Sequence, residues 1–131
     1  METANHEYYV SLEVAKLLKE VGFDWKCNGV FLSEDGTQYA FIKADAACDN
    51  NNSKYNPYNI SAPTLDVAQR WLREKWDLII TIEYNYHKNA FICKVYSKVE
   101  CLSILFDFST YEEFQEAGIK KALEIILEKE K

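Results

Sequence analysis

Cysteine and histidine are the residue types in this chain with the widest chemistry, because they bind transition metals and serve as nucleophiles and bases. A zinc site needs such ligands at close spacing, for example two cysteines separated by roughly two to four residues. The cysteines here are scattered, and the acidic residues beside one of them do not follow the spacing of a calcium loop. We therefore predict no metal site and no cofactor. The residues considered are Cys27, Cys48, Cys93, Cys101, His6 and His87.

Nucleophilic catalysis by Cys93 would require a base within hydrogen-bond reach. In the strand pairing predicted below, Cys93 lies opposite Tyr84, about 10 Å along the sheet from His87 at the usual rise per residue. Cys93 is therefore predicted as a small apolar core residue. Adjacent carboxylates, as in Glu34-Asp35, are explained by a turn, and those at Glu112-Glu113 by a helix start. We predict that the protein is not an enzyme and assign no catalytic residue.

Aromatic residues in irregular segments are the remaining candidates for binding. Tyr and Trp supply rigid contact area, so they are favoured at protein interfaces and as stacking platforms for bases. The alternative interpretation is that they are half-buried cover for a small core. The residues that we select as candidates for interaction are Trp25, Tyr55, Tyr58, Arg70, Arg73 and Trp76.

Charge and hydrophobicity limit the kinds of partner. The 131 residues carry a formal net charge of −6, and no segment is basic. Because nucleic-acid affinity depends largely on neutralising phosphates with Lys and Arg, this balance argues against a general nucleic-acid binder. No apolar stretch is long enough to cross a bilayer, and the start Met1-Glu2-Thr3 has no leader features. We expect a cytoplasmic protein with free thiols that forms one globular domain over residues 1–131.

Three segments have the apolar periodicity of amphipathic helices. Ser11 and Gly22 are suited to the two ends of the first helix, Thr64 to the start of the second, and Thr110-Tyr-Glu-Glu113 is a capping box before the third. Gly118 lies inside the third helix, where it would allow a close approach to a neighbour. The predicted helices cover about Leu12 to Val21, Thr64 to Lys75 and Tyr111 to Glu128. The predicted buried stripes are Leu65, Ala68, Trp71 and Leu72 in the second helix, and Phe114, Ala117, Ala122, Leu123 and Ile126 in the third.

A hairpin and a loop are predicted between the first two helices. Residues Gly29 to Lys43 form the hairpin, with Asp35-Gly36 as a two-residue turn that places Leu32 opposite Tyr39. The same register places Val30 opposite Phe41. The segment Ala44 to Ser61 loses periodicity and is rich in Asn and Asp, so it is predicted as a long loop. A loop of this length is either a binding element or a surface connection.

The stretch from Leu78 to Phe108 contains three alternating apolar runs, which predict an antiparallel meander. Tight turns at Lys88-Asn89 and Lys98-Val99 would align the apolar sides of the strands as one face beneath the helices. The predicted pairs include Tyr86 with Phe91, Tyr84 with Cys93, Ile82 with Val95, Cys93 with Ile104, and, on the other face, Glu83 with Lys94. The fold class is therefore α+β: an antiparallel sheet of this meander and the N-terminal hairpin, with three helices packed on one face.

Three motifs occur in order along the chain. They are Val14-Ala15-Lys-Leu-Leu-Lys-Glu-Val-Gly22-Phe23-Asp24, then Ser61-Ala62-Pro63-Thr64 leading into Trp71-Leu72-Arg73-Glu74-Lys75, then Thr110-Tyr111-Glu112-Glu113 before the last helix. In these motifs the chain resembles a family of small uncharacterised proteins from Bacteroides-type gut bacteria and their phages or integrated elements. The resemblance covers most of the chain, and Ala-Pro-Thr followed by Trp-Leu-Arg-Glu is its most specific part. It implies a bacterial cytoplasm and a mobile-element setting, and it implies no activity or site residue.

The leading functional hypothesis is a non-enzymatic interaction or accessory protein, encoded by a phage or mobile element, that binds a protein partner or itself. It depends on the lack of catalytic motifs and on the aromatics in irregular segments. The alternative is a single-stranded nucleic-acid binding module that stacks bases on aromatics beside a local basic patch. The residues of that patch would be Lys88, Lys94, Lys98, Arg70 and Arg73.

Overall fold

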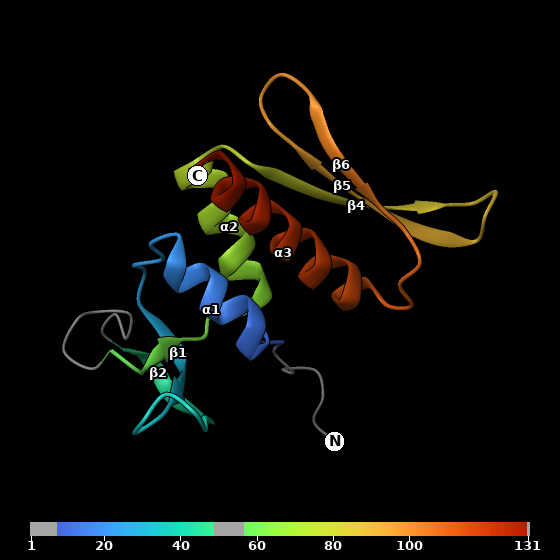
Figure 1. Ribbon diagram of the computed structural model, residues 1–131. Coiled ribbons are helices and arrows are strands. Elements are labelled where there is room, and N and C mark those ends of the chain that lie inside the picture. The colour runs from blue at the N-terminus through green and yellow to red at the C-terminus, as the bar shows by residue number, and fades with distance from the viewer. Residues whose placement is uncertain (1–7, 49–56, 131) are drawn as a thin grey trace. The chain divides into compact units, whose positions relative to one another are not determined.

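The computed structural model describes residues 8–48 and 57–130, with the backbone alone for residues 44–48. The described strands form two antiparallel three-stranded sheets beside helices, so the predicted α+β class is confirmed. The chain divides into two compact units, residues 1–64 and residues 65–131. That all residues make one domain stays a prediction. The elements in order (Figure 1) are α1 (Leu12–Glu20), β1 (Cys27–Leu32), β2 (Ala40–Cys48), β3 (Ile60–Ser61), α2 (Leu65–Trp76), β4 (Ile79–Asn85), β5 (Ala90–Tyr96), β6 (Cys101–Leu105) and α3 (Tyr111–Lys129).

The first unit contains α1 and the sheet β2-β1-β3. The Ser11 hydroxyl caps α1 by accepting the Val14 amide at 3.2 Å. Gly22 follows the helix at φ +96°, in the left-handed region that residues with side chains rarely adopt. Both predicted helix ends are confirmed. The residues that α1 buries are Val14, Ala15 and Leu18.

The hairpin of β1 and β2 has a wider turn than predicted. Leu32 pairs with Ala40 and Phe31 with Phe41, so the predicted pairs of Leu32 with Tyr39 and Val30 with Phe41 are wrong by one residue. The reason lies in the turn, where Ser33 Oγ accepts the Gly36 amide at 2.8 Å. Such side-chain bonds to the backbone stabilise a turn longer than two residues. A one-residue shift moves every side chain of β2 to the opposite face.

The segment predicted as one loop, Ala44 to Ser61, contains strand at both ends, so the loop prediction is wrong there. β2 continues to Cys48, which pairs with Cys27. β3 then pairs with the other side of β1. A central strand needs hydrogen-bond partners on both sides, and β1 finds them in the two flanks of this segment. Residues 49–56, which hold most of its asparagines, lie outside the described residues.

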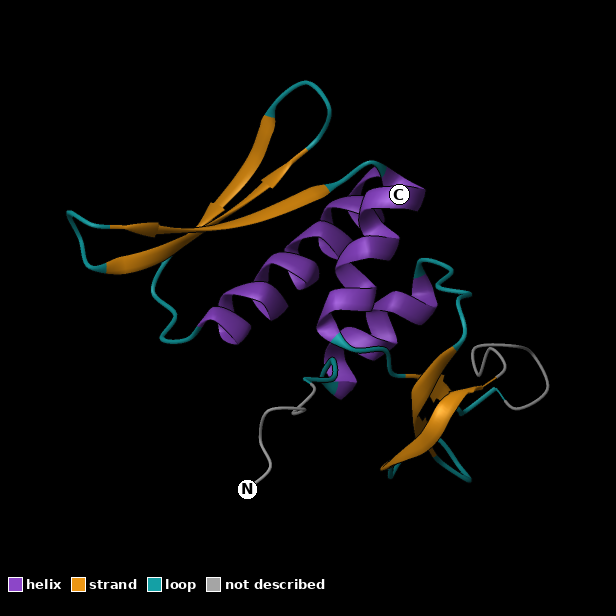
Figure 2. Ribbon diagram, turned by 180° about the vertical axis from the view of Figure 1, so that it is seen from behind, coloured by secondary structure: helices purple, strands orange, loops and turns teal. Residues whose placement is uncertain are grey.

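The second unit contains the meander β4-β5-β6, as predicted, with α2 and α3 on one side of it (Figure 2). α3 contacts all three strands, and α2 contacts β4. The predicted stripe of α2 is confirmed, because Leu65, Ala68, Trp71 and Leu72 are all buried. The predicted residues of α3 are buried except for Ala117, which is half-buried.

The predicted hairpin, β1 and β2, forms a separate sheet with β3 and does not extend the meander.

The register between β4 and β5 is shifted by two residues from the prediction. Ile82, and not Tyr84, pairs with Cys93, because the turn between the strands holds four residues instead of two. A shift of two residues preserves the alternation of faces. Ile80, Cys93 and Val95 therefore still face the helices and are buried, with exposed fractions of 4%, 0% and 0%.

The register of β6 differs by one residue, which changes its face. A bulge between the pairs of Val95 and Tyr96 sets Cys93 opposite Leu105 and Lys94 opposite Ile104. The predicted pair of Cys93 with Ile104 is therefore wrong, and Ile104 lies on the outer face, 47% exposed. The predicted charge pair is wrong too, because Glu83 lies opposite Ile92 and Lys94 opposite Thr81.

A buried polar network joins the two helices of this unit to β4. The side-chain amide of Gln115, 4% exposed, donates to Asp66 Oδ1 at 2.7 Å and to Gln69 Oε1 at 3.0 Å. The amide of Gln69 in turn donates to the carbonyl of Ile80 at 2.9 Å. The buried side-chain amide of Gln115 is therefore satisfied by hydrogen bonds to two residues of α2.

Candidate functional site

A chain of aromatic rings runs from the core of the second unit to its surface. Phe114 is fully buried, and its ring contacts Phe108 at 5.2 Å and Phe91 at 6.0 Å between centroids. Phe91 contacts Tyr84 at 5.3 Å and Tyr111 at 6.1 Å, and Tyr84 contacts Tyr86 at 5.4 Å. We call these residues the aromatic cluster: Tyr84, Tyr86, Phe91, Phe108, Tyr111 and Phe114.

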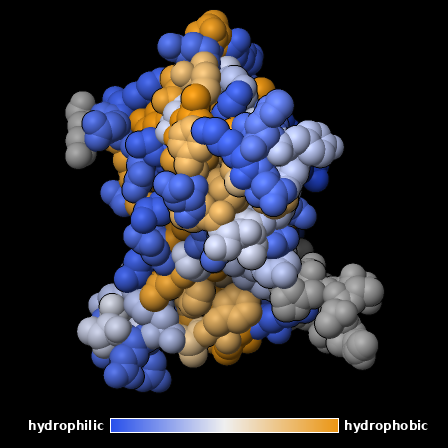
Figure 3. Space-filling model, turned by 90° about the vertical axis from the view of Figure 1, so that its right-hand side faces the viewer, coloured by the Kyte–Doolittle hydropathy of each residue, from blue (hydrophilic) through white to orange (hydrophobic). Residues whose placement is uncertain are grey.

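The outer members of the aromatic cluster are exposed although their neighbours anchor them. Tyr84 and Phe108 are both 42% exposed, Tyr111 is 44% exposed and Tyr86 is 87% exposed. Phe106, beside Phe108 in the sequence, is 48% exposed. Figure 3 faces the side on which the β4–β5 turn lies in Figure 1, and hydrophobic groups reach the surface there between hydrophilic ones. Exposed apolar groups that gather in one place mark interaction sites more often than scattered ones do.

Two asparagines hold the β4–β5 turn that presents the tyrosines. Asn85 Oδ1 accepts the amides of His87 and Lys88 at 2.9 and 3.2 Å. Asn89 has φ +53°, which asparagine tolerates better than most residues, and its side chain accepts the Tyr84 hydroxyl. The turn therefore positions Tyr84 by a hydrogen bond and Tyr86 through the backbone.

The capping box at the start of α3 positions the other half of the cluster. Thr110 Oγ1 accepts the Glu113 amide at 3.1 Å, and the Glu113 carboxylate accepts the amides of Ser109 and Thr110 at 2.8 and 3.1 Å. The predicted capping box is confirmed. Tyr111 and Phe114 are three residues apart and so lie on one face of the helix.

The segments that build the aromatic cluster are acidic. Glu83 precedes Tyr84, Asp107 lies between the two phenylalanines of the connection to α3, and Glu112 follows Tyr111. Lys88 is the basic residue of the β4–β5 turn, and Lys94 of β5 lines the same surface hollow as Glu83, Tyr84 and Tyr86. The segment around Phe108 and Tyr111 carries carboxylates and no lysine or arginine, which suits a positively charged partner and repels phosphates.

The basic residues proposed for nucleic-acid binding do not form one free patch. Arg70 Nε lies 2.9 Å from the Glu74 carboxylate, and Lys98 Nζ lies 3.6 Å from that of Asp77. Lys94 lies on the outer face of the sheet, beside the exposed Ile104. Two of these cations therefore already have anionic partners.

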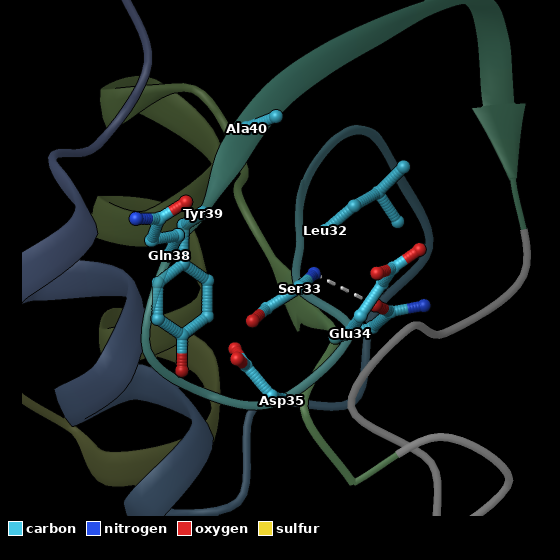
Figure 4. A pocket seen from close by; sticks show the side chains of 8 residues that line it. Leu32, Ser33, Glu34, Asp35, Gln38, Tyr39 and Ala40 are labelled. Carbon is cyan, nitrogen blue, oxygen red and sulfur yellow. Dashed lines mark hydrogen bonds between the residues drawn. The ribbon is translucent and has the colours of Figure 1, made fainter.

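A polar pocket lies at the β1–β2 turn of the first unit (Figure 4), with a volume of about 580 Å³. The side chains of Ser33, Asp35 and Tyr39 turn toward the same space, and the Ser33 amide donates to Asn59 Oδ1 at 3.4 Å. A hydrogen bond from the Thr37 hydroxyl, 2.7 Å away, is the main cause that lowers the pKa of Asp35. The lining residues are Leu32, Ser33, Glu34, Asp35, Gln38, Tyr39, Ala40 and Asn59.

The lining of this pocket offers carboxylates, hydroxyls and amides. A carboxyl with a lowered pKa stays ionised near neutral pH, so Asp35 cannot donate a proton there. The lining residues include no histidine, cysteine or lysine that would supply a nucleophile and base. Among the residues whose side chains are described, no three or more His, Cys, Asp or Glu side chains gather at one place to hold a metal ion.

The residues selected from sequence divide between the two units. Trp25 is half-buried, and Tyr58 lies over the β1–β2 turn, where a Cβ at Gly36 would come within 2.9 Å of its ring. Tyr55 lies outside the described residues. Arg70, Arg73 and Trp76 are all on α2, where the two arginines are exposed and Trp76 is half-buried.

Sequence reasoning missed the aromatic cluster as a site. It placed Tyr84 and Tyr86 on the buried face of longer strands. Asn85 and Asn89 were the signal that the hairpin turns earlier, because both residue types favour turns. With Asn85 opposite Ala90 as the last pair, Tyr86 lies beyond the sheet.

Comparisons of the chain with models of protein families, with curated proteins and with solved structures find no match. The resemblance to a family of gut bacteria and their phages stays a prediction. In the described part of the chain no helix combines the length and the hydrophobicity needed to span a bilayer.

Proposed function

We propose that the protein is a non-enzymatic interaction protein that binds a protein partner through the aromatic cluster. The observation that supports this most is the chain of ring contacts from the fully buried Phe114 to Tyr86, which is 87% exposed. Rings held in place by a buried anchor lose little conformational freedom on binding. They are also the residue types that dominate binding energy at interfaces, where truncation of one costs about 2 kcal/mol or more.

Single-stranded nucleic acid is the second candidate, because exposed rings also stack on bases. The charges around the cluster speak against it. Asp107 and Glu112 lie beside Phe108 and Tyr111 and would repel phosphates, whereas Lys88 of the β4–β5 turn and Lys94 of β5 would attract them. The ion pairs of Arg70 and Lys98 reduce the basic surface further.

An enzymatic role has less support. The pocket at the β1–β2 turn places the Asp35 carboxylate near the hydroxyls of Ser33 and Tyr39, and its lining residues include no histidine, cysteine or lysine to serve as a base. We place the proposed binding function in a bacterial cytoplasm, as an accessory factor of a mobile element. This setting follows from the resemblance and from the composition alone.

Affinity capture with a matched pair of variants tests the proposal. Tyr86→Ser removes the most exposed ring of the cluster, and Val99→Ser removes an equally exposed side chain, also 87%, from the β5–β6 turn of the same sheet. Neither side chain is part of a core, so both variants should fold. Each would be tagged, incubated with a bacterial lysate, and compared with the wild type by quantitative mass spectrometry. Light scattering after size exclusion would measure self-association in parallel.

We expect a partner that the wild type and Val99→Ser retain equally and that Tyr86→Ser loses. Equal recovery by Tyr86→Ser would overturn the assignment to the aromatic cluster. A strictly monomeric protein that recovers no partner in any form would overturn the proposed function itself. Binding of labelled oligonucleotides below about 100 µM, the weak end of non-specific affinity, would favour the second candidate.

A further inference from the structure

Resting on the proposed function, we infer that the partner presents a basic peptide segment to the aromatic cluster, with an arginine or lysine placed over a tyrosine ring. Three properties of the second unit support this: the sign of the charges beside the rings, the angles between the rings, and the supply of cations within the unit.

The charges favour a cationic segment. Asp107 is an exposed carboxylate, and Glu112 is half-buried next to Tyr111. They belong to the connection to α3 and to the first turn of α3, which the ring contact of Phe108 with Phe114 brings together. Glu83 pairs with Ile92 and so lies on the opposite face of the sheet from Tyr84. A peptide that crosses Phe108 and Tyr111 would therefore pass the two carboxylates of residues 107 and 112. Their combined attraction is screened by salt over a Debye length of about 8 Å.

The ring geometry leaves faces open for a cation. The contacts of Tyr86 with Tyr84 and of Tyr111 with Phe91 both have interplanar angles of 82°, so these rings meet edge to face. Tyr86 and Tyr111 each contact one ring of the cluster, so at least one face of each carries no stacked ring from it. The face of a tyrosine ring attracts a guanidinium or ammonium group, and arginine does this more often than lysine.

Two lysines of the first unit lie over tyrosine rings of that unit. In the first unit, Lys16 Nζ lies 5.1 Å from the centre of the Tyr39 ring, and Lys43 Nζ lies 6.0 Å from that of Tyr9. Within the described residues, no lysine or arginine of the second unit lies over a ring of the aromatic cluster. The cluster therefore has the features of a cation-binding ring surface, and no lysine or arginine of the described residues occupies it.

Fluorescence anisotropy with a defined probe tests the inference. The probe is a labelled nonapeptide of alternating arginine and leucine, and its control is the same peptide with glutamate at every arginine. The protein variants are Lys88→Glu, the double variant Asp107→Asn with Glu112→Gln, Tyr86→Ala and the control Val99→Ala. Asn is chosen at Asp107 because φ there is +70°, which Asn tolerates. Lys88→Glu is informative because a gain of affinity cannot come from misfolding.

We expect the arginine peptide to bind and the glutamate peptide not to bind. Lys88→Glu should tighten binding, and the loss of two carboxylates should weaken it about five- to tenfold at low salt, as two exposed charge contacts allow. Tyr86→Ala should weaken it and Val99→Ala should not. No binding of the arginine peptide, or binding that Lys88→Glu leaves unchanged, would overturn the inference. If the arginine peptide fails while Tyr86→Ser still loses a captured partner, the proposed function stands and only the chemistry of the partner is wrong. Tighter binding of an oligonucleotide than of the peptide, or formation of a dimer through the cluster, would also overturn it.

Discussion

Gly118 of α3 lies directly against Cys93 of β5, the central strand of the meander. A Cβ at position 118 would be only 2.7 Å from the Cys93 sulfur, and 2.8 Å from Cγ2 of Ile80 on β4. No other residue fits there without movement, since even a single added methyl group would overlap both side chains. The glycine therefore allows α3 to lie close to the sheet, and the sheet residues beneath it are small or β-branched.

Gly118→Ala should destabilise the protein despite the better helix propensity of alanine. Crowding in a packed core costs about 1–3 kcal/mol, and the propensity gain offsets about 1 kcal/mol of this. Because the added methyl group would overlap two side chains, we expect a crowding cost in the upper part of this range and a net loss of about 1–2 kcal/mol in the free energy of unfolding, measured by urea titration. In a Cys93→Ala background the same substitution should cost less, because the nearest contact is gone. A variant as stable as the wild type would contradict the close approach.

Cys93 should make stability fall at alkaline pH. Burial raises the pKa of its thiol from 9.0 to about 11, so the folded state holds a proton that the unfolded state releases. The contribution of the protonated thiol to the free energy of unfolding is fully present below pH 9 and is lost as the pH rises toward 11. Between pH 9 and 10 the free energy of unfolding should fall by about 1 kcal/mol more in the wild type than in Cys93→Ala. Parallel curves for the two proteins would contradict a buried, protonated thiol.

The polar side chain of Gln115 should be necessary for the stability of the folded protein. Its amide satisfies Asp66 and Gln69 at once, so Gln115→Leu would leave Gln69 without its donor in a half-buried position. We expect a loss of about 1–3 kcal/mol in thermal or urea unfolding. The exposed Gln38 is the control, and Gln38→Leu should change stability by less than about 0.5 kcal/mol. Equal effects of the two substitutions would contradict the network.

Thr110→Ala should shorten or fray the start of α3. The variant loses the hydroxyl that accepts the Glu113 amide, at an expected cost of about 1 kcal/mol, while Thr110→Ser keeps the acceptor and should stay within a few tenths of the wild type. Because the same cap positions Phe108 and Tyr111, Thr110→Ala should also weaken partner binding more than Thr110→Ser does. Urea titration checks the first expectation and peptide anisotropy checks the second.

Helices could be predicted well from this sequence because their ends carry local chemistry. Ser11 and Thr110 make the capping hydrogen bonds that their positions predict. The stripe of α2 follows from periodicity alone, which needs no knowledge of the partner surface.

Strand register was harder, because it depends on turn length and on bulges. The predicted β4–β5 turn was two residues too short. Because side chains along a strand alternate between faces with a period of two, this error left the predicted face of Cys93 correct. The bulge in β6 changed the register by one residue and moved Ile104 to the outer face. Bulges have no reliable sequence pattern, so the faces of β6 could not be derived locally.

The sequence indicates which type of residue to consider for the candidate site but not which of these residues lie together. The sequence selects aromatic side chains in irregular segments, and the choice of Trp25 and Tyr58 followed the irregular segments expected in the first half of the chain. The aromatic cluster depends on contacts between residues as distant in sequence as Phe91 and Tyr111, which no local pattern reports. The sequence also predicted longer strands than those observed, which placed the outer tyrosines beneath the helices.

Site-specific photo-crosslinking tests the central claim most directly. A photoreactive phenylalanine analogue would be incorporated in place of Tyr86, Tyr111 or, as the control, Val99, and the expressing bacteria would be irradiated. The aromatic cluster predicts the same discrete adduct from positions 86 and 111 and none from position 99, where the side chain is as exposed as that of Tyr86. Adducts from position 99 alone, or no adduct from either cluster position, would contradict the claim that this surface binds a partner.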